Sequence, residues 1–457
     1  MNLKLKTICR SGLCVFCMML LLCALAVNGS AAEKELTVEI NGVEVDFTDA
    51  FPENHNNRNF LPFRAIFEAL GAELYYDHKT YTGTAIRGDT IVEVLIGTNI
   101  LTVSRDGGEK EIIEMDVASY SKNNRTYVPV GYMARALGFR AEWDQEHITI
   151  VLVDTETMLK EALDQYEYTL LEKSSAALER YNHGSWNVEG RIDYELTYGK
   201  TALVKAEAEY NGLVAENGKS QIFMSMDADY SVWHRARAAA QGMSLEAMGV
   251  DSDDLYPVMV SETRSDAVAG TNYLYVSKAT GTLDNLPQKT WLTNVSTPAM
   301  SGMDLSTLLE EGSKLDAETI VRAAMAELDL TDCTTAVELA KTCAAEMAKA
   351  LSDDAVVETE DGLMLSWRAV GVDNELLTLC DTNGNVTAVA WEQSTETNGV
   401  QTTTKTAVDK QGMVTYTALA ENSGQTVYMA QSGIYTATKE TPVTTLPKGV
   451  EAVSYSK

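Results

Sequence analysis

NNRTYVPVGYMARALGFRAEWD (residues 123–144) repeats the pattern of NNRNFLPFRAIFEALGAELYYD (residues 56–77) at a spacing of 67 positions. Neither copy holds an evident nucleophile, metal-ligand pair or phosphate-binding loop. The repetition therefore indicates architecture rather than chemistry. The identical pairs are Asn56/Asn123, Asn57/Asn124, Arg58/Arg125, Pro62/Pro129, Ala69/Ala136, Leu70/Leu137, Gly71/Gly138 and Asp77/Asp144.

The identical residues predict the local structure of each copy. The Asn-Asn-Arg tip suits a turn, and the fixed φ of Pro62 and Pro129 suits the first turn of a helix. After an apolar stripe, Gly71 and Gly138 are placed to end the helix in the left-handed conformation that other residues avoid. The chain then returns as a strand.

A hairpin is expected before each copy. LTVEINGVEV (36–45) alternates apolar and polar residues around Asn41-Gly42, and ILTVSRDGGEKEII (100–113) does the same around Asp106-Gly107-Gly108. Each unit thus consists of hairpin, turn, short helix and strand. We expect two such units to lie side by side and to bury their helices against a shared sheet.

The pattern Arg-x3-Pro-x6-Ala-Leu-Gly, followed by an aromatic residue and Asp, resembles the copper amine oxidase N-terminal-like domain. This stalk module is common in exported proteins of Gram-positive bacteria. The resemblance covers roughly residues 36–153. Arg64 agrees with the Pro-x-Arg of the family, whereas Gly131 replaces this arginine in the second copy.

The resemblance does not extend to oxidase chemistry. In the family, that chemistry belongs to a separate domain with three histidine copper ligands, two of them as His-x-His, and a tyrosine-derived cofactor in an Asn-Tyr-Asp/Glu context. Here Tyr273 is followed by Leu274, so we expect Tyr273 to be an ordinary strand residue. No His-x-His pair occurs among the histidines His55, His78, His147, His183 and His234.

Residues 1–32 have the pattern of a signal peptide. A positively charged start precedes an apolar run at 13–27, and Ser30-Ala31-Ala32 offers small residues for cleavage before Glu33. We therefore expect a secreted or cell-surface protein without a transmembrane segment after cleavage. The positive charges of the start are Lys4, Lys6 and Arg10.

A retained membrane anchor and lipidation of Cys23 are the alternatives. The apolar run is short for a membrane span. Leu22 is not the small residue that normally precedes a lipidated cysteine. Both features favour cleavage of the signal peptide and release of the mature chain.

Net charge and cysteine content argue against several classes of binding partner and of structural site. The formal charge of −30 becomes −33 when the signal is removed, and such a charge disfavours nucleic acid and anionic lipid surfaces. The remaining cysteines, Cys333, Cys343 and Cys380, are odd in number and lack a CxxC spacing, so they indicate neither a disulfide framework nor a zinc site. One disulfide with a leftover thiol, or three buried thiols, are both open.

The second half of the chain is strand-rich. Apolar and polar residues alternate in NVEGRIDYELTY (187–198), and the alternation continues in 204–210 and 222–233. This pattern predicts an antiparallel meander with one solvent-exposed face. Two more strands are expected within 271–295, and several follow between 362 and 432.

Helices are expected at 316–328 and 334–351, where apolar residues recur at helical spacing. Strand order and the aromatic rhythm of 273–291 resemble the half-barrel of bacterial lipoprotein-carrier proteins. Six side chains would line such a half-barrel, or else fill a closed core: Tyr194, Tyr198, Tyr210, Met224, Met226 and Tyr230.

Two acidic segments are candidates for cation binding. DTNGNVTAVAWE (381–392) has part of a calcium-loop pattern, but Val386 replaces the required glycine, and a type I′ turn at Asn383-Gly384 explains the same residues. Asp251, Asp253 and Asp254 favour a surface loop over a weak divalent-cation site.

The sequence therefore predicts an α+β protein. Its parts are a signal peptide at 1–32, a duplicated hairpin-helix-strand stalk module at 33–154, a linker helix at 155–183, and an antiparallel β-rich, half-barrel-like domain with inserted helices at 184–457. No catalytic, cofactor-binding or metal-binding residue is assigned, and the binding residues are unknown.

We expect an exported, non-enzymatic envelope or extracellular protein whose stalk presents a binding domain. Its partner would be a cell-wall or envelope component, a partner protein or an apolar small molecule, and not nucleic acid. The alternative is an extracellular hydrolase of cell-wall or other polymers, which needs two carboxylates facing each other in a cleft.

Overall fold

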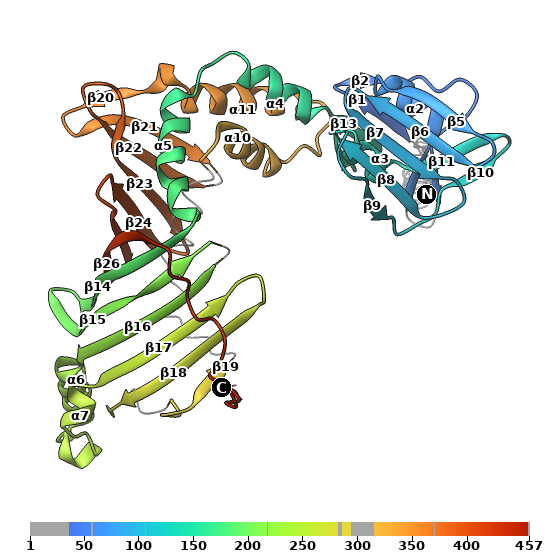
Figure 1. The fold of residues 1–457 in the computed structure, drawn as a ribbon. Coiled ribbons are helices and arrows are strands. Elements are labelled where there is room, and N and C mark those ends of the chain that lie inside the picture. The colour runs from blue at the N-terminus through green and yellow to red at the C-terminus, as the bar shows by residue number, and fades with distance from the viewer. Residues whose placement is uncertain are drawn as a thin grey trace, which may run out of the picture. The chain divides into compact units, whose positions relative to one another are not determined.

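The computed structural model describes residues 36–455 except 56–57, 106, 217, 282–285, 294–314 and 370. The expected signal peptide and the Asn-Asn tip of the first copy lie outside the described residues. Two compact units are present: one runs to Thr157 and also contains Asp329–Ala340, and the other contains Met158–Leu328 and Lys341–Lys457 (Figure 1). The sequence predicted that residues 329–340 belong to the β-rich domain.

The first unit contains three sheets rather than the single shared sheet that was expected. Their strand orders are β12-β13-β1-β2, β10-β11-β4-β3 and β5-β6-β7-β8-β9. The strands are β1 (Thr37–Ile40), β2 (Val43–Glu44), β3 (Glu53–His55), β4 (Arg58–Pro62), β5 (Glu73–Asp77), β6 (Thr82–Arg87), β7 (Thr90–Leu95), β8 (Ile100–Arg105), β9 (Glu111–Glu114), β10 (Tyr120–Lys122), β11 (Arg125–Pro129), β12 (Arg140–Asp144) and β13 (Thr149–Val153).

Equivalent elements begin and end at equivalent residues of the two copies. Strand β4 leads into helix α2 (Phe63–Ala69), and β11 leads into α3 (Val130–Ala136), each with the repeated proline as N-cap. Gly71 and Gly138 have φ values of +75° and +87°, as the sequence predicted. In the second copy, Asn123 and Asn124 also have positive φ, which confirms the turn at its tip.

The two copies pair with each other through β4 and β11. These strands are antiparallel, and Pro62 and Phe60 lie opposite Tyr127 and Pro129. The arginine of each copy forms an ion pair with an aspartate of the other copy, Arg58 with Asp116 and Arg125 with Asp49. The pairing therefore has local two-fold symmetry.

Both helices contribute to one hydrophobic core. Ile66 and Phe67 of α2 and Met133 and Ala134 of α3 are buried in the same cluster as Leu101 of β8. The hairpins predicted at 36–45 and 100–113 are present as β1-β2 and β8-β9. Strands β6 and β7, which separate the copies, had not been identified, although their residues alternate around Gly88-Asp89.

The linker stretch is two helices rather than one. Helix α4 (Thr155–Leu163) ends before α5 (Thr169–Glu179), and a 3-10 turn, η1 (Arg180–Asn182), follows. The carboxylate of Asp353 accepts hydrogen bonds from the backbone N–H groups of Thr169 and Leu170. A residue far along the chain thus satisfies the first N–H groups of α5, and no local pattern could reveal this cap.

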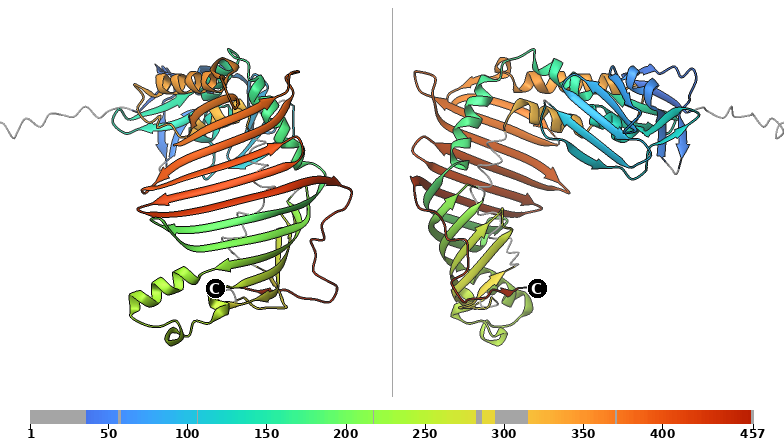
Figure 2. Two further views of the ribbon diagram at one scale, coloured as in Figure 1. Left: turned by 90° about the vertical axis from the view of Figure 1, so that its left-hand side faces the viewer. Right: turned by 45° about the vertical axis from the view of Figure 1, so that its right-hand side comes forward.

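The second unit is built on one fourteen-stranded sheet with the order β20-β21-β22-β23-β24-β25-β26-β14-β15-β16-β17-β18-β19-β27. Figure 2 shows these strands side by side in one curved half-barrel. Its strands are β14 (Ser185–Tyr198), β15 (Thr201–Ala215), β16 (Lys219–Asp229), β17 (Val258–Asp266), β18 (Thr271–Ala279), β19 (Trp291–Thr293), β20 (Val357–Thr359), β21 (Gly362–Ala369), β22 (Val372–Cys380), β23 (Val386–Thr397), β24 (Val400–Asp409), β25 (Met413–Asn422), β26 (Gln425–Thr438) and β27 (Val453–Ser454).

The meander predicted for 187–229 is confirmed, but β16 ends at Asp229. Tyr230 is instead the N-cap residue of helix α6 (Ser231–Gln241), which the sequence analysis had placed in a strand up to 233. Strand β17 had not been identified. The predicted helices are α10 (Ala317–Ala326), capped by Asp316, and α11 (Ala336–Leu351). In the described part of the chain, every helix is too short or too polar to cross a lipid bilayer.

Candidate functional site

The face of the large sheet that α5 covers is the first candidate site, and we call it the inner face. The Ser174 hydroxyl of α5 lies 2.7 Å from the Thr378 hydroxyl of β22. The strand register continues this face from Thr378 through Val389 of β23 and onward to Ile192 of β14. One residue in two along each strand therefore belongs to it.

The inner face carries no charged residue within the described positions of β14–β16 and β21–β26. Its central positions are Leu365, Trp367, Asn374, Leu376, Thr378, Val389, Trp391, Gln393, Thr404, Thr406, Val408, Val414, Tyr416, Ala418, Val427, Met429, Gln431, Ile192, Tyr194, Leu196, Val204, Ala206, Ala208, Tyr210, Ile222, Met224 and Met226.

The residues predicted to line the half-barrel divide into three groups. Tyr210 and Met224 are buried, which fits a closed core. Tyr194 and Met226 share the face and are half-buried. Tyr198 is 60% exposed at the end of β14, and Tyr230 lies beyond the end of β16 as the N-cap residue of α6. Open apolar surface therefore remains around Tyr194 and Met226.

The Tyr210 side chain packs over two glycines of the inner face, Gly190 and Gly433. Its hydroxyl donates to the Ser432 carbonyl at 3.2 Å, and Gly190 pairs with Gly433 beneath it. A Cβ on Gly433 would lie 2.3 Å from the Tyr210 hydroxyl, and one on Gly190 would lie 2.0 Å from the Ser432 carbonyl oxygen. These glycines are required because the ring occupies the space of their side chains.

The outer face holds the charged side chains of these strands, as the alternation predicted, together with exposed apolar residues such as Phe223 and Ile434. Arg191 pairs with Asp193 and Glu207 on this face. The C-terminal segment crosses it, because Arg264 donates to the Thr445 carbonyl and Val443 donates to Gln221. A groove of about 520 Å³ lies between this segment and β17–β19, with the Arg264 guanidinium 4.6 Å above the Trp291 ring.

The two acidic segments have structural roles. Asp251 and Asp254 form a capping box at the start of the short helix α7 (Ser252–Leu255). Asp381 accepts from the Asn385 side-chain amide and from the backbone N–H groups of Asn385 and Asn383, and these bonds, the side-chain one first, lower the pKa of its carboxyl. Gly384 has positive φ but Asn383 does not, so the turn is not the predicted type I′.

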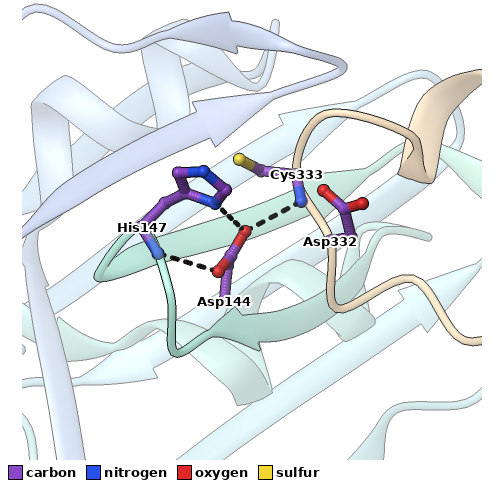
Figure 3. A group of neighbouring side chains, drawn as sticks. All are labelled: Asp144, His147, Asp332 and Cys333. Atoms are coloured by element: carbon purple, nitrogen blue, oxygen red, sulfur yellow. Dashed lines mark hydrogen bonds and ion pairs between the residues drawn. The ribbon is translucent and has the colours of Figure 1, made fainter.

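A cluster of mixed ligating side chains lies within the first unit. Asp144 ends β12, His147 follows in the next turn, and Asp332 and Cys333 come from the segment 329–340 (Figure 3). One possible ligand atom from each residue lies within 4.8 Å of the others. Sequence spacing could not reveal this cluster, because His147 and Asp332 are 185 positions apart.

Asp144 is the centre of the cluster. Its Oδ1 accepts from the backbone N–H groups of Glu146 and His147, each at 2.9 Å. Its Oδ2 lies 2.7 Å from His147 Nδ1 and accepts from the Cys333 backbone N–H at 3.1 Å. The backbone hydrogen bonds, chiefly that of His147, hold the pKa of the carboxyl well below its usual range.

Cys333 and Asp332 have different environments. Cys333 is buried, and burial together with nearby Asp144 raises the pKa of its thiol to about 11. Asp332 is exposed, and its carboxylate accepts from Thr334 and Thr335. Cys333, Cys343 and Cys380 are all free thiols, which removes the disulfide alternative for these residues. The alternative of three buried thiols is also wrong, because Cys343 is half-buried and Cys380 is exposed.

The first unit contains the element order and the repeated Arg-Pro-Gly framework over residues 39–152. These residues match the model of the copper amine oxidase N-terminal domain. The resemblance seen in the sequence is thereby confirmed for about a quarter of the chain. A comparison with curated proteins gives no match.

One solved structure shows a faint similarity to this chain. A chain from the complex structure of Pseudomonas aeruginosa MucA/MucB is 9% identical, over 58% of this chain and 94% of that chain, with a TM-score of 0.09. This value is too low to support an argument about fold or function.

The copper amine oxidase N-terminal domain suggests a non-catalytic accessory role for residues 39–152. Tyr273, the tyrosine whose context faintly resembles the oxidase cofactor site, lies in the second unit. It is a strand residue of β18, opposite Arg264 and Thr293. The expectation of an ordinary strand tyrosine is confirmed.

Proposed function

We propose that this protein is an exported, non-enzymatic envelope or extracellular protein. In this proposal the copper amine oxidase N-terminal domain is an accessory stalk module. The half-barrel binds an apolar or amphipathic ligand, or the apolar segment of a partner protein, on its inner face.

One observation carries the proposal: the described positions of the inner face on β14–β16 and β21–β26 carry no charge, in a chain whose formal charge is −30. Burying uncharged surface is favourable, whereas unpaired charges on a binding face would oppose an apolar ligand. Half-buried Tyr194 and Met429 lie opposite each other on β14 and β26, and half-buried Met226 lies on β16, across the small side chains of β15.

The hydrolase alternative gains no support from this face. A glycoside-type mechanism needs two carboxylates on either side of the bond to be cleaved. The carboxylates nearest in sequence, such as Asp193 and Glu207, belong to the outer face and pair with Arg191. We therefore propose binding rather than hydrolysis.

The binding role is tested by placing one charge on each face. In the full chain, Met226→Lys puts an ammonium group on the inner face, and Phe223→Lys puts one on the outer face of the same strand, where Phe223 is 43% exposed. An environment-sensitive apolar dye should bind the wild type and Phe223→Lys, and bind Met226→Lys at least about tenfold more weakly.

Circular dichroism and thermal unfolding establish that both variants are folded. Equal dye binding by a folded Met226→Lys variant would contradict the inner face as the binding surface. Loss of dye binding in both variants would point to the outer face or to the groove beside Arg264.

Export is tested separately from binding. Expression in a Gram-positive host should release a chain whose mass and first residue place cleavage before Glu33. A retained Met1 or a lipid on Cys23 would contradict secretion by signal cleavage.

A further inference from the structure

We propose that Asp144, His147, Asp332 and Cys333 together bind one zinc ion. The four side chains offer one sulfur, one nitrogen and two carboxylate oxygens, and their ligand atoms already lie within 4.8 Å of one another. The inference concerns the first unit and does not depend on what the half-barrel binds.

The set of ligand atoms selects the class of metal. Sulfur and imidazole ligands suit zinc and related transition metals, whereas calcium and magnesium prefer oxygen alone. Ligand atoms around a tetrahedral zinc ion lie about 3.3–3.8 Å apart, given its bond lengths. Small side-chain rotations therefore bring the four atoms from their present spacing to that geometry.

The surroundings hold the ligands in place. Glu146 and His147 backbone N–H groups fix one oxygen of Asp144, which leaves the other oxygen directed at the cluster. The Thr334 backbone and hydroxyl fix one oxygen of Asp332 at 2.9 and 2.7 Å. Such outer hydrogen bonds orient metal ligands in proteins.

Charge also favours a cation at this position. Asp144 and Asp332 place two carboxylates beside the Cys333 thiol, with ligand atoms within 4.8 Å of one another. A divalent ion would neutralise this local negative charge. Asp332 is exposed, so the cluster opens to solvent on that side.

A bound ion would join two distant parts of the chain. Asp144 and His147 belong to the second copy of the repeat, whereas Asp332 and Cys333 belong to Asp329–Ala340 of the same unit. Four protein ligands leave no open position, so the site would be structural rather than catalytic. The zinc ion would link the segment 329–340 to the second copy of the repeat through its ligands.

The test uses cobalt as a spectroscopic substitute for zinc in the full chain. After treatment with a chelator and a non-thiol reductant, one equivalent of Co²⁺ should produce a thiolate-to-cobalt absorption band and tetrahedral d–d bands, and Zn²⁺ should remove both. The band should be absent in Cys333→Ser and retained in Cys380→Ser, whose thiol is exposed elsewhere. This comparison isolates Cys333 from the cysteines of residues 1–32.

Asp332→Asn and Asp329→Asn form a matched pair, because each removes one exposed acidic charge from the same segment. Asp329 uses its carboxylate on its own turn at Thr331. We expect Asp332→Asn to weaken cobalt binding at least about tenfold and Asp329→Asn to leave it within about twofold.

Zinc should raise the unfolding temperature of the wild type and of Asp329→Asn, but not of Asp332→Asn. Two results would overturn the proposal: no thiolate-to-cobalt band in the wild type, or equal binding by folded Asp332→Asn and Asp329→Asn. The second result would mean that surface carboxylates bind the metal without a defined site.

Discussion

Leu61 lies directly opposite Val128 in the antiparallel strands β4 and β11, and the two residues occupy the same position in the two copies of the repeat. A residue that faces its own equivalent lies on a local two-fold axis. The duplicated sequence therefore builds the centre of the first unit by pairing with itself.

Arg87 and Asp154 are a second pair of equivalent positions in contact, and this pair is largely buried. Arg87 also donates to the Leu137 carbonyl at 3.1 Å. We predict that Arg87→Ala lowers the free energy of unfolding of the first unit by about 3 kcal/mol, because Asp154 loses its ionic partner. Chemical denaturation measures this loss.

Arg64→Ala is the control for Arg87→Ala. Arg64 is 78% exposed, and its distance to Glu68 is 3.9 Å. A change within about 0.5 kcal/mol is expected. Equal effects of the two substitutions would show that the buried pair does not stabilise the unit.

Gly71 and Gly138 give a matched test of the repeat. Both have positive φ, so alanine at either position should cost about 1–2 kcal/mol in backbone strain. At Gly138 the new Cβ would also lie 2.9 Å from Glu156 Cβ, whereas nothing lies within 4 Å at Gly71. Thermal unfolding should therefore show Gly138→Ala to be the more destabilised variant, and the reverse order would contradict this packing.

Gly433 and Tyr210 should be energetically coupled. Gly433→Ala should cost about 1–3 kcal/mol from crowding, and Tyr210→Phe about 1 kcal/mol from the lost hydrogen bond. Since Tyr210→Phe also removes the atom that the new Cβ would meet, the double variant should lose less than the sum. A double-mutant cycle measures this, and strict additivity would argue against the contact.

The Asp381 carboxyl should make the stability of the fold depend on pH. The pKa of its carboxyl is lower in the folded state, so its stabilising effect is complete above an unfolded pKa of about 4 and declines as pH falls toward the folded value. Asp381→Ala should therefore reduce stability at pH 7 and have a smaller effect at pH 3. Denaturation midpoints at both values measure this, and an equal loss at both would exclude the ionised carboxylate as the cause.

Amine oxidation is not expected from this chain. Tyr273 lacks the flanking carboxylate of the oxidase motif and pairs as a strand residue in β18. Incubation with primary amines after copper addition should release no hydrogen peroxide above a Tyr273→Phe control. Turnover that disappears in Tyr273→Phe would overturn the non-enzymatic assignment.

Much of the local structure was predictable from the sequence. Proline, glycine and asparagine restrict the backbone wherever they occur, so the repeat identified its helices and their ends before any contact was known. The alternation of apolar and polar residues identified the strands β14–β16 and β21–β26, because a strand with one apolar face has a period of two residues. Both signals are local along the chain.

Contacts between distant residues were decided only by the tertiary structure. Asp353 caps α5 by accepting from Leu170, 183 positions away, and Asp144 accepts from Cys333, 189 positions away. No sequence pattern links residues that are this far apart. The sequence by itself determined the repeat and, for β14–β16 and β21–β26, the existence of the strands and the face that carries their charged residues. The tertiary structure alone determined that β4 pairs with its own equivalent, that 329–340 joins the first unit, and that four ligating side chains meet there, because these depend on chain packing rather than on local backbone preference.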